Sequence, residues 1–371
     1  MARVVENRWP GKLDGLVVTR YGHGVPCSQI EVVEAGHPMP DKAGLKAARR
    51  ILDLVVNLTP DDLVLALISG GGSALLTVPP AGITLAEMQS LTAALLKSGV
   101  PISEINCVRK HLSAIKGGRL ALAAAPAPVV ALIISDVPGD DPALVASGPT
   151  APDPTTSANA ADILRGRGIN VPEPVAAWLK NPQSETPKPG DPAFAQVQNR
   201  IIASSGMAVA ATARIAGAAG LVVNNLGDVE GEARMLARDH AQTALQLQRE
   251  GKAALILSGG ETTVTLRGNG RGGRNSEYLL ALAAALDGAD GIWAIACDTD
   301  GIDGSEDNAG AVIAPDTLRR AAALGLSAND ALAQNNSYGF FADLGDLIVT
   351  GPTRTNVNDF RAILIAGSRK K

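Results

Sequence analysis

The stretch that decides the fold runs from Val64 to Ser73 and reads Val-Leu-Ala-Leu-Ile-Ser-Gly-Gly-Gly-Ser. Its five leading apolar residues are typical of a strand buried on both faces of a parallel sheet. The three glycines that follow let successive backbone N–H groups converge, because no Cβ atom interferes. Ligands bind at such strand ends in open α/β sheets, so the pattern predicts a phosphate or carboxylate site made by Gly70, Gly71, Gly72 and Ser73. The simpler alternative is a tight turn between a strand and a helix.

The rest of the chain repeats this alternation of short apolar runs and longer segments with helical periodicity. The strand candidates are Leu16–Thr19, Val64–Ile68, Val129–Ile134, Ile201–Ala203, Leu221–Val223, Ala254–Leu257, Ile292–Ala296 and Leu347–Val349. The helix candidates are Lys42–Asn57, Thr84–Lys97, Ile102–Lys116, Gly206–Ala218, Gly231–Arg249 and Asn275–Leu286. We therefore expect an α/β protein with largely parallel, helix-flanked sheets.

Two domains are expected from the length of 371 residues. Between Arg274 and Arg319 the sequence has nine acidic residues and no lysine or arginine. We therefore place the boundary near Gly251, with domains at residues 1–250 and 251–371. The proline-rich stretch Pro172–Asp191 is predicted to be an exposed segment outside the core.

The overall composition excludes several classes of function. With 33 Lys and Arg against 37 Asp and Glu, the net charge of -4 gives no field that attracts nucleic acid or anionic lipid. The uncharged stretch Leu120–Ser135 is too short to cross a membrane. Cys27, Cys107 and Cys297 are far apart and odd in number, which favours a reducing cytoplasm without disulfides. The oligomeric state stays open, a homo-oligomer included.

A second glycine cluster, Gly268–Gly273, matches the pattern G-x-G-x-x-G. It follows the strand-like Thr262–Leu266 and precedes a predicted helix, which is the context that a dinucleotide-binding fold requires. Arg271 and Arg274 would bring two guanidinium groups to the helix start, where they suit the oxygens of a transferring phosphoryl group. A glycine-rich hairpin with solvated arginines is the structural alternative.

An acidic loop follows the predicted strand that ends at Ala296. It fails as a calcium loop, because Gly301 comes too early and no glutamate stands at the twelfth position. Asp298 and Asp300 are better placed as magnesium ligands, or as a base for a substrate hydroxyl. Several carboxylates near one loop would repel each other without a cation or an arginine partner.

A cationic cluster lies on the predicted helix Ile102–Lys116 and at its end. Arg109, Lys116 and Arg119 share one face by three- and four-residue spacing, so they can contact an anionic substrate together. A solvated helix face is the alternative. Asp136 follows another apolar strand candidate and is also placed at a strand end.

Two histidines lie on predicted loops. His23 and His37 are candidates for acid–base groups, although isolated loop histidines are more often structural.

Five segments together resemble the glycerate 2-kinases of the MOFRL type. They are ISGGGSALL at Ile68–Leu76, NCVRKHLSAIKGGRLA at Asn106–Ala121, ISDVPGDDPALVASGPTAPDPTT at Ile134–Thr156, GRGGRNSE at Gly270–Glu277 and DTDGIDGSEDNAGA at Asp298–Ala311. The resemblance runs through nearly the whole chain. It implies a larger N-terminal and a smaller C-terminal α/β domain, with an active-site cleft between them. The reaction that it implies is the ATP- and magnesium-dependent phosphorylation of D-glycerate, a small sugar acid, to 2-phosphoglycerate.

The resemblance also suggests roles for particular residues. Arg274, the second arginine of the Gly-Arg-Gly-Gly-Arg-Asn motif, is implied in handling glycerate or the phosphoryl group. We expect Lys116 and Arg271 to stabilise phosphoryl charge, and Arg109 and Asp136 to join the glycine loop in substrate binding.

Members of the resembling family usually begin further upstream, with a strand and a Gly-x-Gly-Lys-Ala loop. The N-terminal domain is therefore expected to lack that first strand and the lysine loop. A misplaced start codon is the preferred explanation, because the loss of a central strand would expose apolar edges.

The second candidate function is that of a hydroxypyruvate reductase, an NAD(P)H-dependent enzyme of tartrate degradation that works on the same carbon skeleton. It would use the fingerprint Gly268–Gly273 and take Asp298 as the acid for the ribose. The arginines of that fingerprint favour the kinase. A third class is a sugar-acid or nucleotide-binding module without catalysis, which would not need Arg274 and the acidic loop together.

Overall fold

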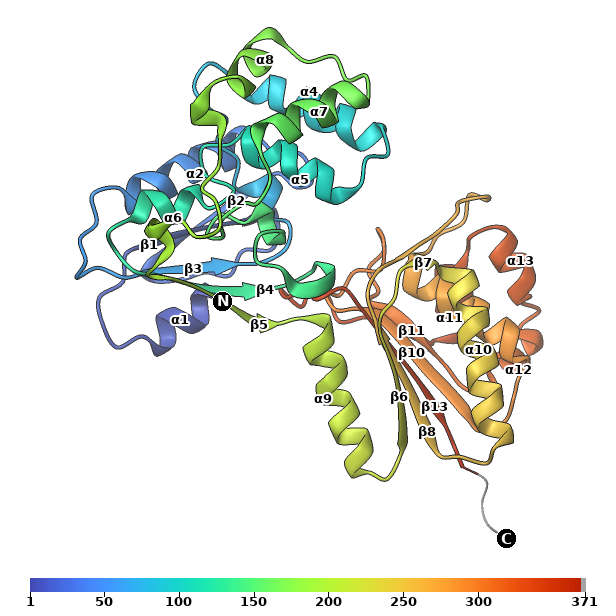
Figure 1. Ribbon diagram of the computed structural model, residues 1–371. Coiled ribbons are helices and arrows are strands. Elements are labelled where there is room, and N and C mark those ends of the chain that lie inside the picture. The colour runs from blue at the N-terminus through green and yellow to red at the C-terminus, as the bar shows by residue number, and fades with distance from the viewer. Residues whose placement is uncertain (368–371) are drawn as a thin grey trace. The chain divides into compact units, whose positions relative to one another are not determined.

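The computed structural model describes residues 1–367 of the chain. They fold into two compact units, Met1–Ile202 and a second that begins at Ala203 (Figure 1). This division comes earlier than the boundary between residues 250 and 251 that the charge pattern predicts. Strand β6 (Val222–Asp228) pairs with β8 (Ala254–Gly259) in one sheet, so backbone hydrogen bonds join the two sides of the predicted boundary.

The first unit contains two small groups of strands. They are β1 (Gly15–Arg20) with β2 (Ile30–Ala35), and β3 (Val64–Ile68) with β4 (Val129–Ile134) and β5 (Val197–Ala203). β1 pairs with β2 in parallel, and β3 pairs with β4 in parallel. β3 and β4 coincide with the apolar runs that the sequence predicts, whereas Glu31 and Glu34 interrupt the apolar pattern of β2 and hide it.

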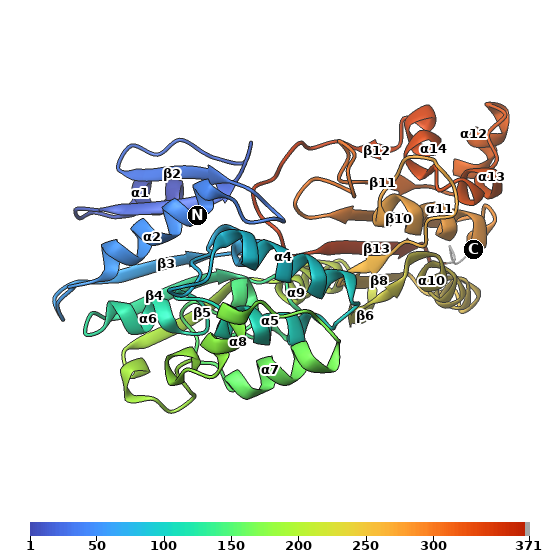
Figure 2. The ribbon, with the colours of Figure 1, turned by 90° about the horizontal axis from the view of Figure 1, so that it is seen from above.

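Eight helices of this unit surround these strands or extend from them. They are α1 (Ala2–Arg8), α2 (Lys42–Val55), α3 (Gly72–Leu75), α4 (Leu85–Lys97), α5 (Ile102–His111), α6 (Arg119–Ala124), α7 (Ser157–Gly166) and α8 (Glu173–Leu179). Helices α4, α5, α7 and α8 gather around a core of their own (Figure 2), which includes Leu91, Val108 and Leu164. The helix predicted at Ile102–Lys116 is shorter than expected.

The proline-rich stretch Pro172–Asp191 is not the exposed excursion that its composition predicts. Val175 and Leu179 of α8 are buried in the helical core, and Ser184 and Thr186 are buried as well. The prolines mark turns between short packed pieces, so they do not indicate exposure here.

The second unit is built on a six-stranded sheet with the order β12-β11-β10-β13-β8-β6. Besides β6 and β8, this sheet contains β10 (Ile292–Asp298), β11 (Gly310–Ile313), β12 (Leu347–Ile348) and β13 (Asp359–Ile365). The unit also contains β7 (Gly231–Glu232) and β9 (Thr262–Thr263), which pair with each other outside this sheet. Only the β6–β8 pair of this sheet is parallel within the described residues, and the other four pairs are antiparallel. The α/β class is confirmed, but the expectation of largely parallel pairing is wrong for this unit. Apolar runs alone do not encode the direction of pairing.

Helices cover both faces of that sheet. They are α9 (Ser205–Ala218), α10 (Ala233–Arg249), α11 (Arg274–Leu286), α12 (Thr317–Ala323), α13 (Ala328–Ala333) and α14 (Ser337–Leu344). α11 is buried over most of its length in the main core, together with α10. α9 packs on the opposite face against Leu255 and Leu257 (Figure 1).

Within residues 1–367, no helix combines the length and the apolar character that a membrane span needs. The three cysteines are all unpaired.

The buried His240 makes the stability of the second unit depend on pH. Its Nδ1 lies 2.7 Å from the hydroxyl of Tyr278. Burial and the nearby Arg361 lower the pKa of His240 from 6.5 to about 4. Between these two pKa values His240 is protonated in the unfolded chain and neutral in the folded chain. The free energy of unfolding therefore falls as the pH drops from 6.5 towards 4.

We expect His240→Gln to reduce this pH dependence, because glutamine still meets Tyr278 but does not titrate. The wild-type chain should lose on the order of 3 kcal/mol more than the variant between these limits. Urea unfolding followed across that pH range measures the difference, and parallel curves for the two proteins would contradict the assignment.

Candidate functional site

The glycine loop after β3 is covered closely by side chains from other parts of the first unit. A Cβ at Gly70 would lie 1.7 Å from Oδ2 of Asp136, and one at Gly71 would lie 3.2 Å from Nε2 of His37. A Cβ at Gly72 would lie 2.7 Å from that of Ala146. Gly71 also has φ +75°, a conformation that favours glycine. The three glycines are therefore required for close approach, as well as for the turn.

Arg109 reaches the same loop from α5. Its Nη1 lies 3.5 Å from Oγ of Ser73, and that hydroxyl lies 2.8 Å from the hydroxyl of Ser147. Ser147 in turn donates to Oδ1 of Asn106 at 3.1 Å. Burial lowers the pKa of Arg109, and within residues 1–367 no carboxylate is paired with it. The loop thus carries a positive charge that the described part of the chain leaves uncompensated, which suits an anionic ligand.

Ser147 adopts φ +61°, in the left-handed region where a non-glycine residue is uncommon. The preceding Ala146 has φ +53° and forms the contact over Gly72. Such strain costs of order 1–3 kcal/mol and concentrates at functional sites. Ser147 and Asn106 are not predicted from the sequence, because nothing in the local pattern around them marks a site residue.

Lys116 and Arg119, the other two members of the predicted cationic face, do not share a helix face with Arg109. The helix ends at His111, so the periodicity that would align Arg109 with Lys116 and Arg119 does not continue. Nζ of Lys116 donates to the carbonyl of Leu76, and burial together with the charge of Arg109 lowers the pKa of Lys116 to about 7. Arg119 donates to the backbone carbonyls of residues 183, 184 and 185, so its role is to hold that segment.

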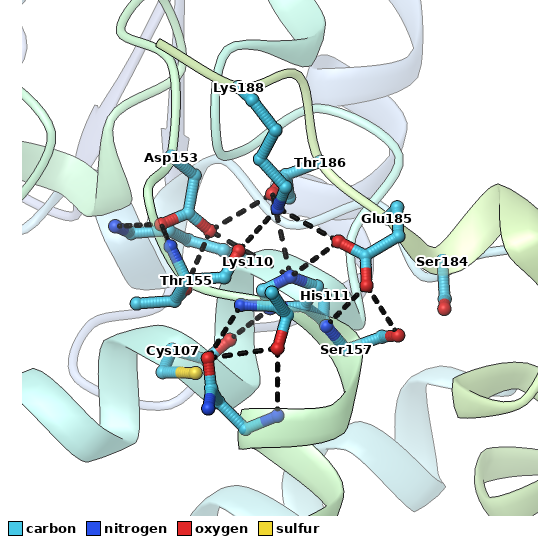
Figure 3. Close-up of polar contacts among 12 residues, drawn as sticks. Cys107, Lys110, His111, Asp153, Thr155, Ser157, Ser184, Glu185, Thr186 and Lys188 are labelled. Atoms are coloured by element: carbon cyan, nitrogen blue, oxygen red, sulfur yellow. Dashed lines mark hydrogen bonds and ion pairs between the residues drawn. The ribbon is translucent and has the colours of Figure 1, made fainter.

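A buried polar network fixes the end of α5 (Figure 3). Nζ of Lys110 lies 3.1 Å from Oδ1 of Asp153, and both side chains are almost completely buried. Asp153 also accepts hydrogen bonds from Thr155 and Thr186. His111 bonds through Nδ1 to the carbonyl of Cys107 at 2.9 Å. This places its Nε2 3.9 Å from Asp153 and 3.8 Å from Glu185.

Glu185 extends the network to α7, where it accepts from the backbone N–H and the hydroxyl of Ser157. Lys188 lies 2.8 Å from the other carboxylate oxygen. The segment that follows α8 is thereby tied to α5, the helix that carries Arg109.

In the second unit, Arg274 is surrounded by acidic side chains. Its guanidinium donates to Oδ1 of Asp359 at 2.8 Å, to Oε1 of Glu261 at 2.6 Å and to Oδ2 of Asp298 at 2.7 Å. These carboxylates raise the pKa of Arg274 against the effect of burial. The structure brings together Arg274 and Asp298, which the sequence analysis considered separately, and the sequence gives no sign of Asp359 or Glu261. Arg274 is the arginine partner that the crowded acidic groups need.

Asp298 and Asp300 are the candidate magnesium ligands. Burial and the neighbouring Asp300 and Asp359 raise the pKa of Asp298. Its Oδ2 is held by Arg274, and its Oδ1 accepts from the N–H of Asp300. Among residues 1–367 no group of three or more His, Cys, Asp or Glu is arranged to hold a metal ion. Magnesium at a nucleotide site needs only one or two carboxylates besides phosphate and water, so these two residues fit an ion that arrives with a nucleotide.

The fingerprint Gly268–Gly273 does not have the context that a dinucleotide site requires. The preceding strand β9 has two residues and pairs with β7, outside the main sheet. A Cβ at Gly268 would lie 2.4 Å from Cα of Gln334, and Gly270 donates its N–H to the carbonyl of Gln334. Asn335 and Asn336 accept from further N–H groups of the loop. The glycines therefore pack against the chain itself.

Arg271 does not converge with Arg274. It pairs with Glu306 at 2.5 Å, and its guanidinium lies 4.3 Å from the ring centre of Tyr338. Its side chain is 62% exposed.

Comparison with known proteins covers both units. Residues 254–359 match the MOFRL family, and residues 1–180 match a domain of unknown function, DUF4147. The D-glycerate 2-kinase of Thermotoga maritima is 42% identical over 93% of this chain and 82% of its own length. The chain belongs to the glycerate 2-kinase family of the MOFRL type.

Two further comparisons describe this family member. A crystal structure of glycerate kinase from Thermotoga maritima matches 95% of this chain and 85% of its own, with a TM-score of 0.89 and 41% identity. An Agrobacterium vitis protein named "Putative hydroxypyruvate reductase" is 55% identical over 98% of this chain and 84% of its own length.

For this family member we expect Asp153→Asn to be strongly destabilising, because Lys110 would stay buried without its counter-charge. A loss of about 3–5 kcal/mol is expected in urea unfolding. The matched control is Asp162→Asn, which breaks the exposed pair of Asp162 with Arg165 and should cost less than about 1 kcal/mol. Similar losses for the two variants would refute the importance of the buried pair.

Proposed function

We propose that this chain is a D-glycerate 2-kinase, which transfers the γ-phosphoryl group of ATP to the 2-hydroxyl of D-glycerate and forms 2-phosphoglycerate. The observation that carries the proposal is the glycine loop with Arg109, a partly buried cation without a carboxylate partner in the described residues. The relationship to the Thermotoga maritima kinase supports it.

The nucleophile in this reaction is the hydroxyl of the substrate, so the protein has to position it and to screen the charge of the phosphoryl group. Arg109 and the hydroxyl of Ser73 would bind a carboxylate or phosphate oxygen beside Gly70, Gly71 and Gly72. Asp136 would accept a hydrogen bond from a substrate hydroxyl, because a carboxylate cannot bind an anion directly.

We assign the remaining residues as follows. Asp298 and Asp300 would hold magnesium that arrives with ATP, and magnesium would neutralise charge on the phosphate oxygens. Arg274 would hold Asp298 in place, since it already contacts that carboxylate. Arg271 and Lys116 are weaker candidates for charge stabilisation, because Arg271 is paired with Glu306 and Lys116 is bonded to the carbonyl of Leu76.

The reductase is the second candidate, since two Agrobacterium vitis relatives have that name. It would require NAD(P)H to bind at Gly268–Gly273. Several N–H groups of that loop already donate to Gln334, Asn335 and Asn336, which leaves a pyrophosphate few partners.

A pair of assays on the 371-residue chain separates the two candidates. One contains D-glycerate, ATP and Mg²⁺ and measures ADP. The other contains hydroxypyruvate and NADH and measures NADH oxidation. We expect ADP formation that depends on glycerate, and NADH oxidation without any ADP formation would overturn the kinase proposal.

Arg109→Ala should lower kcat/KM for D-glycerate by about 100-fold or more, because the variant removes a charge-assisted contact to the substrate. Arg165→Ala is the matched control, since that arginine is exposed and pairs only with Asp162 among the described residues. Equal activity in the two variants would remove Arg109 from the site.

A further inference from the structure

The four histidines of the chain differ in one respect that bears on catalysis. Both ring nitrogens of His23 are bonded, to Tyr21 and Arg20. His111 is bonded to Cys107 and His240 to Tyr278. Among residues 1–367, His37 alone has neither ring nitrogen in a hydrogen bond within the chain. Its imidazole therefore has both nitrogens available to a ligand.

His37 lies directly over the glycine loop. The distance from its Nε2 to the position of a Cβ on Gly71 is 3.2 Å, and that from its Cδ2 is 3.3 Å. The residue is exposed, so solvent and small molecules can reach the ring. A Cβ at residue 71 would press against the imidazole, so glycine suits this close approach.

The charges around His37 keep it able to accept a proton. Partial burial and the positive charges of Arg20 on β1 and Arg109 on α5 lower its pKa from 6.5. Acidic groups lie nearby as well: Asp136 faces Gly70, and Asp41 accepts from the N–H of Gly36. A neutral imidazole beside a bound anion is suited to general base catalysis near neutral pH.

We propose that His37 is the general base that takes the proton from the 2-hydroxyl of D-glycerate. This inference rests on the proposed kinase function. The substrate O–H bond breaks and its proton moves to a ring nitrogen of His37. The oxygen then bonds to the γ-phosphorus of ATP, the bond from that phosphorus to the bridging oxygen breaks, and ADP leaves with the electron pair. The proton on His37 is later released to solvent.

Asp136 is the competing base, because its carboxylate lies over the neighbouring Gly70. The imidazole is favoured, since it lies next to the cation that would orient the substrate carboxylate. Two variants separate these groups: His37→Gln and Asp136→Asn each remove a proton acceptor and keep similar size.

The test measures kcat and KM for D-glycerate in wild type, His37→Gln and Asp136→Asn between pH 5 and 9. We expect His37→Gln to lower kcat by about 100-fold or more with KM changed less than about threefold. The wild-type kcat/KM should fall on acidification below pH 6.5, and this acid limb should disappear in His37→Gln. His240→Gln, at a buried histidine of the second unit that is bonded to Tyr278, is the matched control and should keep near-normal kcat. Thermal unfolding verifies that each variant is folded.

Other outcomes overturn the proposal. If kcat of His37→Gln stays within about fivefold of wild type, or if the acid limb persists, His37 is not the base. If only Asp136→Asn loses kcat, the carboxylate is the base. If wild type forms no ADP, the kinase function fails, and NMR of the histidine resonances then shows whether D-glycerate still binds at His37. A shift of those resonances without turnover would assign a sugar-acid binding site and refute proton transfer.

Discussion

The first unit is organised around a backbone that other side chains touch directly. Asp136, His37 and Ala146 come from three separate segments and lie close over Gly70, Gly71 and Gly72, and a Cβ has no room at Gly70 or Gly72. The loop after β3 is thereby held from several sides, and β3 and α3 are fixed against the segments that carry those residues. The same loop presents its backbone beside Arg109, so the requirement for glycine serves both packing and ligand binding.

Several buried charges in both units are paired with a group of opposite charge. Asp153 is matched by Lys110, and Asp359 and Asp298 are matched by Arg274. The attraction within such a buried pair is largely offset by the cost of removing both charges from water. Loss of one partner nevertheless lowers the free energy of unfolding strongly, because the other charge stays buried without compensation. Lys116, which is bonded to the carbonyl of Leu76, and Arg109, which lies beside the glycine loop, depart from the pattern, because neither pairs with a carboxylate within residues 1–367. An anionic ligand at the glycine loop would compensate the positive charge of Arg109, so binding should depend on the charge of the ligand.

Local patterns in the sequence predict the parts of the fold that depend on neighbouring residues. The apolar runs Val64–Ile68 and Val129–Ile134 appear as β3 and β4, and the adjacent glycine loop is where the candidate site lies. Strand β13 is not predicted from the sequence, because Asp359 and Arg361 interrupt its apolar residues. The contacts of these two charged groups, with Arg274 and with the carbonyl of Gly259, join residues far apart in the chain. Pairing direction and long-range ion pairs cannot be read from a local window.

The glycine fingerprint illustrates the same limit. Its spacing is that of a nucleotide-binding loop, yet the partners of Gly268 and Gly270 come from residues 334–336. A motif defined by glycine spacing indicates that the backbone closely approaches another group. Only the tertiary structure shows whether that group is a ligand or another part of the chain.

Helix α5 carries Arg109 and Lys110 in succession, with one cation at the glycine loop and the next in the ion pair with Asp153. Successive residues of an α-helix differ in direction by about 100°. An insertion or deletion of a single residue between Ile102 and Arg109 would therefore rotate both cations away from their partners at once. Homologous chains should accept substitutions on the outer side of this helix while keeping its length unchanged, and length variation should collect in the loop before it.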